Sequence, residues 1–507
     1  MVARWLASAS AALSEAGRSR SAGTGDVRRR WRMRRVRLRL SRMEQPTLVI
    51  GLDCVPPRLF DFPWAASLVN LQALWRGGSA FRARSTVPPI TVPAWASMTT
   101  GRSPGELGLY GFRDRIAGSY NHRINLAHRC RAPRIWDTLS AQGYRTAAVS
   151  VPLTWPVVPR EHTQDPLVIS GLLTPSRHER WCNDDSVAAA LTATCGHFIP
   201  DVLAYRNVPL EEVLGQAHAL TKQRFAMVRQ LLQAQAWDFM MLVDIAPDRV
   251  HHAAWRHLDP AHPYFNAHTR EHAQAVAYYH ALDDEVGRLC ASLPATWSVR
   301  IVSDHGAKAR LGAFYINAYL EQLGLLTWKE EGSPACSEPQ QAQKGRPTTD
   351  DIDFSRTLAW AEGGYYARVY LNLADRDPEG VIHARDAART LEEVRAALLG
   401  APLPADLPAP WVVRPEEVYP QAQGNPPDLM ACFGDLAITP LAGRAPRNAL
   451  YEPAAQDDTD SCVHDWDGLL ALPAQPPSHP TPQAADLPVR LLTECLTDLV
   501  PEKPLEP

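Results

Sequence analysis

Short apolar runs alternate along this chain with longer stretches in which apolar residues recur every three or four positions. The runs have the length and composition of buried β-strands and lie at residues 47–52, 145–151, 238–245 and 298–303. Between them, residues 210–235 and 269–293 have the periodicity of amphipathic helices. Strands that alternate with long helices are typical of an α/β fold. We therefore predict a doubly wound, mainly parallel sheet with helices on both faces.

The pattern changes after the fourth run. Residues 329–350 are polar, with scattered proline and glycine, which predicts a surface loop. Residues 352–460 contain many prolines and only short extended segments. This composition indicates an inserted, smaller α+β region over residues 329–460 that would cap a catalytic core. The core is predicted to comprise residues 44–328 and 461–507.

The two ends of the chain have compositions of their own. Residues 1–43 contain 12 Arg, no Lys and two acidic residues. Such a composition occurs in organelle transit peptides, but we favour a disordered extension upstream of a start at Met43. A basic arm that contacts nucleic acid or membrane is the third alternative. Near the other end, we predict a proline-rich linker over residues 472–487 and a short helix over 489–499.

Charge and cysteine content limit the classes of function. Residues 44–507 contain 40 basic and 53 acidic residues, a net charge of about −13, and so acidic a body is not expected to bind nucleic acid stably. No run approaches the roughly 18 apolar residues of a membrane span. Nine cysteines without a Cys-x-x-Cys pair argue against a disulfide framework and favour a reducing compartment, which we take to be the cytoplasm.

Acidic residues and histidines follow directly after three of the apolar runs. Asp53 follows the first, Asp248 and His252 follow the third, and Asp304 and His305 follow the fourth. In an open α/β sheet, ligands bind outside the carboxyl ends of the strands. Asp248 and His252 are four residues apart, so one turn of helix would present both on the same face. A buried Asp-His pair needs a partner for its charge, and a metal provides one.

Neighbouring residues leave alternatives open. His251 would point away from a site that His252 faces, and Asp244 would serve as the carboxylate if the local chain were extended. Cys54 is a candidate nucleophile, but a small buried core residue is the simpler interpretation. His464 is interpreted as a ligand only because it would complete one site as the third ligand. Oxygen and imidazole ligands suit Zn or Mn, and a two-metal site suits the hydrolysis of phosphate esters.

Thr91 begins the motif Thr91-Val92-Pro93-Ala94-Trp95. Thr is a good N-cap and Pro93 suits a first turn, so we predict a helix from about Val92 to Thr99 that ends near Gly101. The Thr91 hydroxyl would then lie at a helix N-terminus, where backbone N–H groups favour a phosphate. A Thr hydroxyl is a weak nucleophile unless a base or a metal activates it. An isolated Thr would therefore be interpreted as a plain N-cap.

Taken in order, these motifs resemble those of the alkaline phosphatase superfamily, specifically its type I phosphodiesterase/nucleotide pyrophosphatase branch. The resemblance extends from about Thr47 to Leu499. The residues that carry it are Gly51-Leu52-Asp53, Thr91-Val92-Pro93-Ala94-Trp95, Thr100-Gly101-Arg102-Ser103-Pro104-Gly105, Asp248-Arg249-Val250-His251-His252, Ser303-Asp304-His305-Gly306-Ala307 and His464.

The resemblance implies two metal sites. One would be formed by Asp53, Thr91, Asp304 and His305. The other would be formed by Asp248, His252 and His464. The cofactors would be two divalent ions, for which Zn is the usual metal in the family, and the Thr91 oxygen would attack phosphorus to form a phosphothreonine intermediate.

We therefore predict a phosphodiesterase or nucleotide pyrophosphatase that acts on a small-molecule phosphate ester or nucleotide. A sulfatase is disfavoured, because sulfatases of this superfamily place Arg four residues after a Cys or Ser nucleophile, whereas this chain has Trp95 four residues after Thr91. The alternatives are a phosphomutase or phosphomonoesterase with the same metals, and a catalytically silent relative that binds metal or ligand. Arg113 and Arg115 would contact substrate or, more simply, form surface ion pairs. The stretch 361–366 resembles one in uncharacterised members of this branch.

Overall fold

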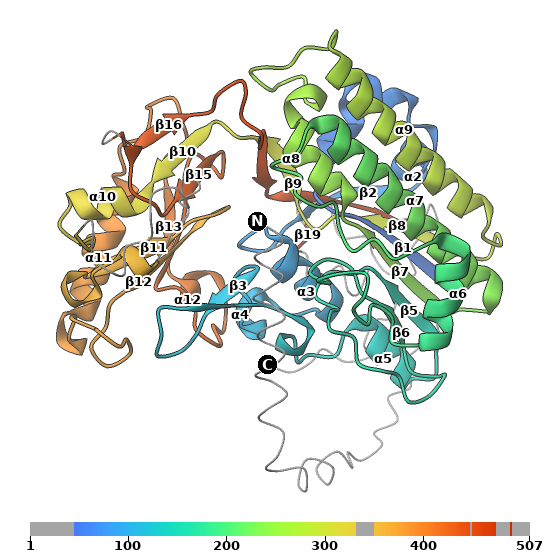
Figure 1. The fold of residues 1–507 in the computed structure, drawn as a ribbon, viewed down its shortest axis with the longest axis horizontal. Helices are drawn as coiled ribbons and strands as arrows, with labels where there is room; N and C mark the ends of the chain where they lie inside the picture. Colours follow the sequence, from blue (N-terminus) through green and yellow to red (C-terminus); the bar gives the residue numbers. More distant parts are fainter. Residues whose placement is uncertain (1–44, 331–348, 447–448, 473–486, 489–507) are drawn as a thin grey trace, which may run out of the picture.

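The computed structural model describes residues 45–330, 349–446 and 449–472 and the backbone of residues 487–488. Within these residues, the chain forms a larger α/β unit with a smaller unit beside it (Figure 1). The larger unit is built on an eight-stranded sheet of order β19-β2-β18-β8-β1-β7-β5-β6. Its strands are β1 (Thr47–Leu52), β2 (Ser79–Arg84), β5 (Thr146–Val149), β6 (Leu167–Ile169), β7 (Phe239–Asp244), β8 (Ser298–Val302), β18 (Asp467–Leu472) and β19 (Leu487–Pro488).

The centre of this sheet is parallel. β1 pairs in parallel with β7 and β8, and β5 pairs in parallel with β7 and β6. The register places Leu52 opposite Asp244, so the carboxyl ends of β1 and β7 are level. β18 runs antiparallel between β8 and β2, an addition that the apolar pattern did not reveal. The α/β, mainly parallel fold predicted from the sequence is confirmed.

Helices cover both faces of the sheet (Figure 1). Leu48 and Ile50 of β1 pack on one face among apolar residues of α7, α8 and α9, and Val49 packs on the other face with Trp95 and Met98. The two predicted long helices form as α7 (Leu210–Ala234) and α9 (Arg270–Ala291). The remaining helices of this unit are α2 (Val69–Arg76), α3 (Thr91–Thr100), α4 (Pro104–Leu107), α5 (Ile135–Ala141), α6 (Asp185–Cys195) and α8 (Ala246–Leu258). The faces of the sheet are therefore buried under helices, and the polar side chains of the site lie at one edge of the sheet.

The smaller unit, here called the cap, comprises residues 312–330 and the described part of 349–453. It has a four-stranded antiparallel sheet, β11-β12-β14-β13, and a three-stranded sheet, β15-β10-β16, around a separate apolar core. The strands are β10 (Gly312–Tyr315), β11 (Ala359–Glu362), β12 (Ala367–Leu371), β13 (Trp411–Val413), β14 (Leu429–Cys432), β15 (Ile438–Leu441) and β16 (Tyr451–Pro453). The helices are α10 (Ile316–Gln322), α11 (Ala384–Leu399) and α12 (Pro415–Val418).

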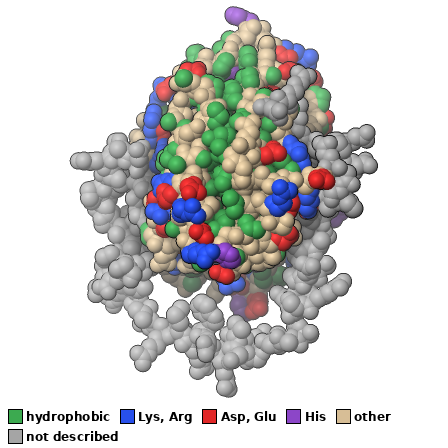
Figure 2. Space-filling view, turned by 90° about the vertical axis from the view of Figure 1, so that its left-hand side faces the viewer, with side chains coloured by type: hydrophobic (Ala, Val, Ile, Leu, Met, Phe, Trp, Pro, Cys, Tyr) green, Lys and Arg blue, Asp and Glu red, His purple; other side chains and the backbone are tan. Residues whose placement is uncertain are grey.

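β10 and α10 precede residue 329, yet Phe314, Ile316 and Leu320 pack in the core of the cap. The structure therefore groups these elements with the insertion, while the division of the chain at residues 328 and 460 stays a prediction. Figure 2 shows the face of the molecule that the cap forms, where a band of hydrophobic side chains runs between charged ones.

Several sequence predictions concern segments that the structure leaves undescribed. The Arg-rich extension over residues 1–43, the helix over 489–499 and nearly all of the linker over 472–487 lie outside the described residues. Most of the loop predicted over 329–350 does so too. Among the helices that the structure describes, none has both the length and the apolar character needed to cross a membrane.

Candidate metal centre

The predicted ligands converge at the carboxyl ends of the central strands. Asp53 follows β1 directly, and Asp304 and His305 follow β8 after one residue. All three side chains are buried. His305 Nε2 lies 3.6 Å from Asp53 Oδ1, 3.2 Å from Asp304 Oδ2 and 3.3 Å from Thr91 Oγ1. We call these four residues the first cluster.

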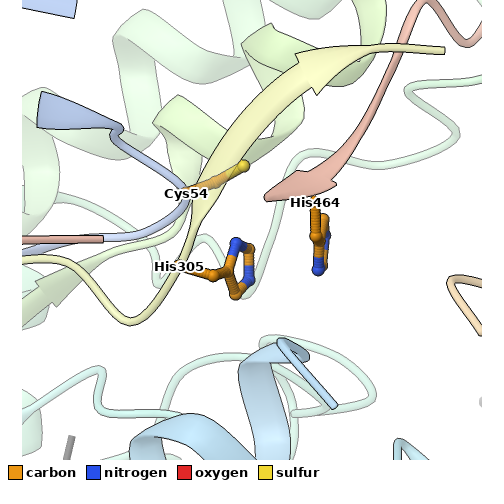
Figure 3. Close-up of side chains that lie close together, drawn as sticks. All are labelled: Cys54, His305 and His464. Carbon is orange, nitrogen blue, oxygen red and sulfur yellow. The ribbon is translucent and has the colours of Figure 1, made fainter. Parts of the chain in front are cut away.

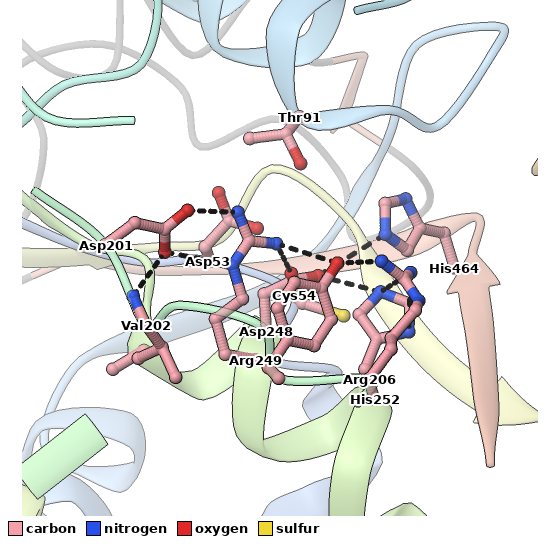
Figure 4. Close-up of polar contacts among 12 residues, drawn as sticks. Asp53, Cys54, Thr91, Asp201, Val202, Arg206, Asp248, Arg249, His252 and His464 are labelled. Atoms are coloured by element: carbon pink, nitrogen blue, oxygen red, sulfur yellow. Dashed lines mark hydrogen bonds and ion pairs between the residues drawn. The ribbon is translucent and has the colours of Figure 1, made fainter. Parts of the chain in front are cut away.

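A second cluster is formed by Asp248, His252 and His464 (Figure 4). Asp248 and His252 share one face of α8, as their spacing predicts, and Asp248 Oδ1 lies 3.5 Å from His252 Nε2 and 3.3 Å from His464 Nε2. His464 comes from β17 (Cys462–Asp465), which pairs antiparallel with β9 (Gly306–Ala309). That pairing sets His464 opposite Ala307, so its ring stacks on the His305 ring with centroids 3.7 Å apart. The two clusters are therefore adjacent.

Both clusters fit divalent metals. Asp53 Oδ1, Asp248 Oδ1, Asp304 Oδ2 and His464 Nε2 are buried and have no hydrogen-bond partner among the described residues, and such atoms are costly unless a ligand satisfies them. Tetrahedral ligands at the roughly 2.0–2.1 Å of zinc–nitrogen and zinc–oxygen bonds lie about 3.3 Å apart. The spacings of 3.2–3.6 Å within the two clusters match that value.

The imidazoles present unprotonated nitrogens to these positions. Nδ1 of His305 lies 3.2 Å from the Gly306 carbonyl oxygen, and Nδ1 of His464 lies 2.8 Å from that of Pro89. A carbonyl oxygen can only accept a hydrogen bond, so Nδ1 carries the proton and Nε2 keeps its lone pair. Burial lowers the pKa of both histidines, and a neighbouring imidazole lowers each of them further. The neutral form that binds metal is the favoured form.

The carboxyl groups of the first cluster resist ionisation in the absence of a cation. Burial raises the pKa of Asp53, and the nearby charges of Asp304 and Asp248 raise it further. Burial likewise raises the pKa of Asp304. Asp248 differs, because contacts with His252, His464 and Arg249 outweigh its burial and hold its pKa well below the ordinary value. Two divalent cations would offset this concentration of negative charge.

Thr91 lies at the start of α3, although not as its N-cap. The helix begins at Thr91 itself, with Ile90 as the N-cap and Gly101, at φ 70°, as the C-cap. The difference of one residue keeps the hydroxyl at the N-terminal end, where the first-turn N–H groups of a helix favour an anion. α3 also anchors the first cluster, since Trp95 Nε1 donates a hydrogen bond of 2.7 Å to Asp53 Oδ2.

Asp460 and Arg206 belong to the site and were absent from the sequence prediction. Asp460 Oδ1 accepts a 2.7 Å hydrogen bond from His252 Nδ1, and its other oxygen pairs with Arg206 Nε at 2.5 Å. A carboxylate that orients a ligand histidine is a recurrent feature of metal sites. Asp460 is four residues before His464 in an otherwise polar loop, so no periodic pattern marks it.

A buried arginine orients Asp248. Arg249 Nη1 donates to Asp248 Oδ2 at 2.6 Å, and Arg249 forms a two-pronged ion pair with Asp201, both contacts at 3.0 Å (Figure 4). One Asp248 oxygen is thereby held and the other is left facing the two histidines. The guanidinium charge is already balanced by these carboxylates.

Of the alternative residues, His251 and Asp244 make their contacts outside the clusters, whereas Cys54 lies beside them. His251 Nε2 contacts the Tyr279 hydroxyl in the helical core, where burial lowers the pKa of His251 to about 3. Asp244 accepts hydrogen bonds from Thr221 Oγ1 and the Ala246 N–H. The Cys54 thiol lies 3.4 Å from the Gly306 carbonyl oxygen and close to His305 and His464 (Figure 3), with ligand atoms of the three residues within 4.8 Å of one another, and burial raises its pKa.

Arg113 and Arg115 make ion pairs with the cap. Arg115 is buried, pairs with Asp377 and donates to the Ser119 carbonyl oxygen at 2.8 Å. Arg113 lies 3.2 Å from Glu362. These are contacts between the two units and not the surface pairs that we expected as the default.

Comparisons with known proteins identify the family of the chain. The family model for type I phosphodiesterase/nucleotide pyrophosphatase matches residues 47–453. No curated protein sequence matches the chain significantly. Two crystal structures of phosphonoacetate hydrolase from Sinorhizobium meliloti 1021, in complex with phosphonoformate and with phosphonoacetate, have TM-scores of 0.58 and 0.59 at 18% identity. Each comparison covers 90% of this chain and 96% of the other.

A structure of murine ectonucleotide pyrophosphatase/phosphodiesterase 5 matches at a TM-score of 0.48 and 12% identity, over 90% of this chain and 96% of that one. At these identities the structural matches speak for the fold alone. The family assignment depends on the family model, which spans most of the chain. The protein belongs to the type I phosphodiesterase/nucleotide pyrophosphatase family of the alkaline phosphatase superfamily.

Proposed function

We propose that this protein is a two-metal phosphodiesterase or nucleotide pyrophosphatase with Thr91 as its nucleophile. The observation that carries the proposal is the convergence of unpartnered buried ligand atoms in two adjacent clusters, with Thr91 Oγ1 3.3 Å from His305 Nε2. The first cluster would hold one divalent ion and the second cluster the other. Ions bound there would lower the pKa of the Thr91 hydroxyl and offset the charge that develops on phosphate oxygens.

The chain's own residues then define the reaction. Thr91 Oγ attacks phosphorus as its proton is lost to solvent, the bond from phosphorus to the leaving oxygen breaks, and a phosphothreonine forms. Water next attacks the same phosphorus and releases Thr91 and the product. The free N–H groups at the start of α3 would favour the phosphoryl oxygens.

A diester is favoured over a monoester by the charge around the clusters. The two arginines that contact the second cluster are already paired, Arg249 with Asp201 and Asp248, and Arg206 with Asp460. A monoester dianion brings one more negative charge than a diester and would need a further cation. The phosphonoacetate bound to the similar hydrolase is a small anion of that more highly charged kind, so we treat it as the competing substrate class.

Zinc is the proposed metal, with manganese as the alternative, because the donors are carboxylate oxygens and imidazoles. The cytoplasmic location stays a prediction from cysteine content. The substrate is proposed to be a small-molecule ester or a nucleotide.

The test is hydrolysis of bis(p-nitrophenyl) phosphate, p-nitrophenyl phosphate and phosphonoacetate by zinc- or manganese-loaded protein. We expect the diester to be preferred, and Thr91→Ala to lower kcat by at least about 1000-fold while metal content is kept. Thr91→Ser should restore part of the rate. Thr99→Ala is the matched control, because Thr99 is buried in the same helix and donates to the Trp95 carbonyl oxygen. Full activity in Thr91→Ala would refute the nucleophile assignment, and preferred turnover of either other compound would refute the diester assignment.

A further inference from the structure

Tyr365 is the residue through which the cap reaches the second cluster. Its ring stacks on the His464 ring, with centroids 3.7 Å apart and an angle of 21° between the planes. Its hydroxyl lies 3.0 Å from His252 Nε2. His464 is thus held between Tyr365 on one side and His305 on the other. The phenol therefore contacts the second cluster as well as packing beside the apolar residues around Tyr366 and Tyr419.

A glycine turn aims Tyr365 at this position. Gly363 and Gly364 connect β11 to β12, directly before Tyr365. A Cβ on Gly363 would lie 2.2 Å from the Pro440 carbonyl oxygen, and Gly364 has a φ of 132°. Side chains other than hydrogen rarely accept either condition. This turn conformation therefore requires glycine at both positions, and it places the phenol beside the second cluster.

The direction of the Tyr365 hydroxyl proton follows from its partners. Arg206 Nη2 donates to the phenol oxygen at 3.3 Å, so the oxygen accepts there and keeps its own proton to donate. In this structure its other contact is His252 Nε2, whose lone pair accepts because Nδ1–H donates to Asp460, and which Arg206 Nη2 also approaches at 3.4 Å. When that lone pair binds a metal, the Tyr365 proton needs another acceptor at the same place.

We propose that Tyr365 is a catalytic residue that donates a hydrogen bond to the leaving-group oxygen of the substrate. This inference depends on the proposed phosphodiesterase function. As the bond between phosphorus and the leaving oxygen breaks, that oxygen takes the electron pair, and the Tyr365 hydroxyl stabilises the developing charge without giving up its proton. Solvent supplies the proton that the leaving group finally takes. Arg206 is a positioning residue, because it acts through the phenol.

The test compares Tyr365→Phe with Tyr366→Phe. Tyr366 is the next residue, and its buried hydroxyl donates to the Tyr110 carbonyl oxygen at 2.7 Å, within the contact between the two units. The control variant therefore loses one phenol hydroxyl near the same turn without touching the clusters. The substrates are methyl p-nitrophenyl phosphate and methyl phenyl phosphate, because the second has the more basic leaving group and needs more stabilisation.

We expect Tyr365→Phe to lower kcat about 10-fold with the nitrophenyl ester, whose leaving group needs little stabilisation, and about 100-fold with the phenyl ester, the lower end of the range for loss of one preorganised donor. Tyr366→Phe should lower both rates equally and by less than about threefold. Metal content should remain two ions per chain in both variants. An equal loss on the two esters, or loss of a metal from Tyr365→Phe, would overturn the proposal.

A second measurement does not depend on turnover. Orthovanadate mimics the transferring phosphoryl group, and its binding to the metal-loaded protein can be followed by calorimetry. Tyr365→Phe should weaken vanadate binding about 10-fold, as expected for one donor to a charged oxygen, and Tyr366→Phe should not. Unchanged binding in Tyr365→Phe would overturn the role of Tyr365. Full activity in Thr91→Ala would instead refute the proposed function, so the two failures are distinguishable.

Discussion

The two clusters of the candidate metal centre are built in different ways. The residues of the first cluster come from the larger unit, at the ends of β1 and β8 and at the start of α3, and its neighbour Trp95 lies in α3 as well. The second cluster combines one turn of α8 with His464, which returns from beyond the cap on β17. Its outer contacts are Asp460, Arg206 and Tyr365.

This difference indicates that the topology of the sheet sets the positions of the residues in the first cluster. The positions in the second cluster depend on how the chain returns from the cap. Strand ends in a buried parallel sheet have little freedom, whereas a loop residue such as Asp460 is held by its own ion pair. We therefore expect the second cluster to be the more easily weakened of the two.

The largest effect is expected from His464→Ala. Removing the third ligand of the second cluster should lower the metal content from two ions per chain to one and reduce kcat by at least about 1000-fold. Metal content measured by atomic emission after gel filtration checks the first claim. Asp304→Ala, in the first cluster, should also lose one ion, and Co(II) spectra should differ between the two variants. Two retained ions in His464→Ala would remove His464 from the site.

A smaller effect is expected from the residues that orient the ligands. Asp460→Asn should weaken binding of the more loosely held ion by about 10- to 100-fold, because a carboxylate behind a ligand histidine contributes that much to metal affinity. Trp95→Phe removes the corresponding hydrogen bond of the first cluster and is the matched comparison. Competition with a chelator measures both affinities. If Trp95→Phe loses its ion as readily as Asp460→Asn, the two clusters are equally robust and our comparison fails.

The smallest effect concerns pH and the contact between the units. The side chain of His122 is 7% exposed, its Nδ1 is 3.0 Å from Glu362 Oε1, and burial lowers its pKa from 6.5 to about 3. Between these values the unfolded chain binds a proton that the folded chain does not, so falling pH disfavours folding by up to about 1.4 kcal/mol per pH unit at this group. Relative to wild type, His122→Gln should gain about 1–2 kcal/mol in the free energy of unfolding between pH 7 and pH 5.

Urea unfolding of both proteins at the two pH values measures this difference, in which the contributions of all other histidines cancel. Parallel loss of stability in wild type and His122→Gln would show that His122 does not carry the effect. Between pH 7 and pH 5, we also expect the ion of the second cluster to be lost before that of the first, and the metal content of the protein measures this loss.

Much of the fold was predictable, because its signals are local. The buried strands and the helices α7 and α9 have strong apolar periodicity, and both were located to within a few residues. β18 was not foreseen, since its antiparallel partners β2 and β8 are more than 160 residues away in the chain and pairing leaves no local mark. The same reason explains why β10 and α10 were assigned to the core although they pack in the cap.

By itself, the sequence determined which side chains could serve as ligands, because Asp53, Asp304 and His305 directly follow strands that must end at one edge of the sheet. It also determined that Asp248 and His252 share a helix face, since four residues complete about one turn. Only the tertiary structure decided which other residues contact these ligands. The pairing of β17 with β9 placed His464 against His305, and the Gly363-Gly364 turn placed Tyr365 against His252. Such contacts join residues far apart in the chain, and their energies depend on burial and geometry that exist only after folding.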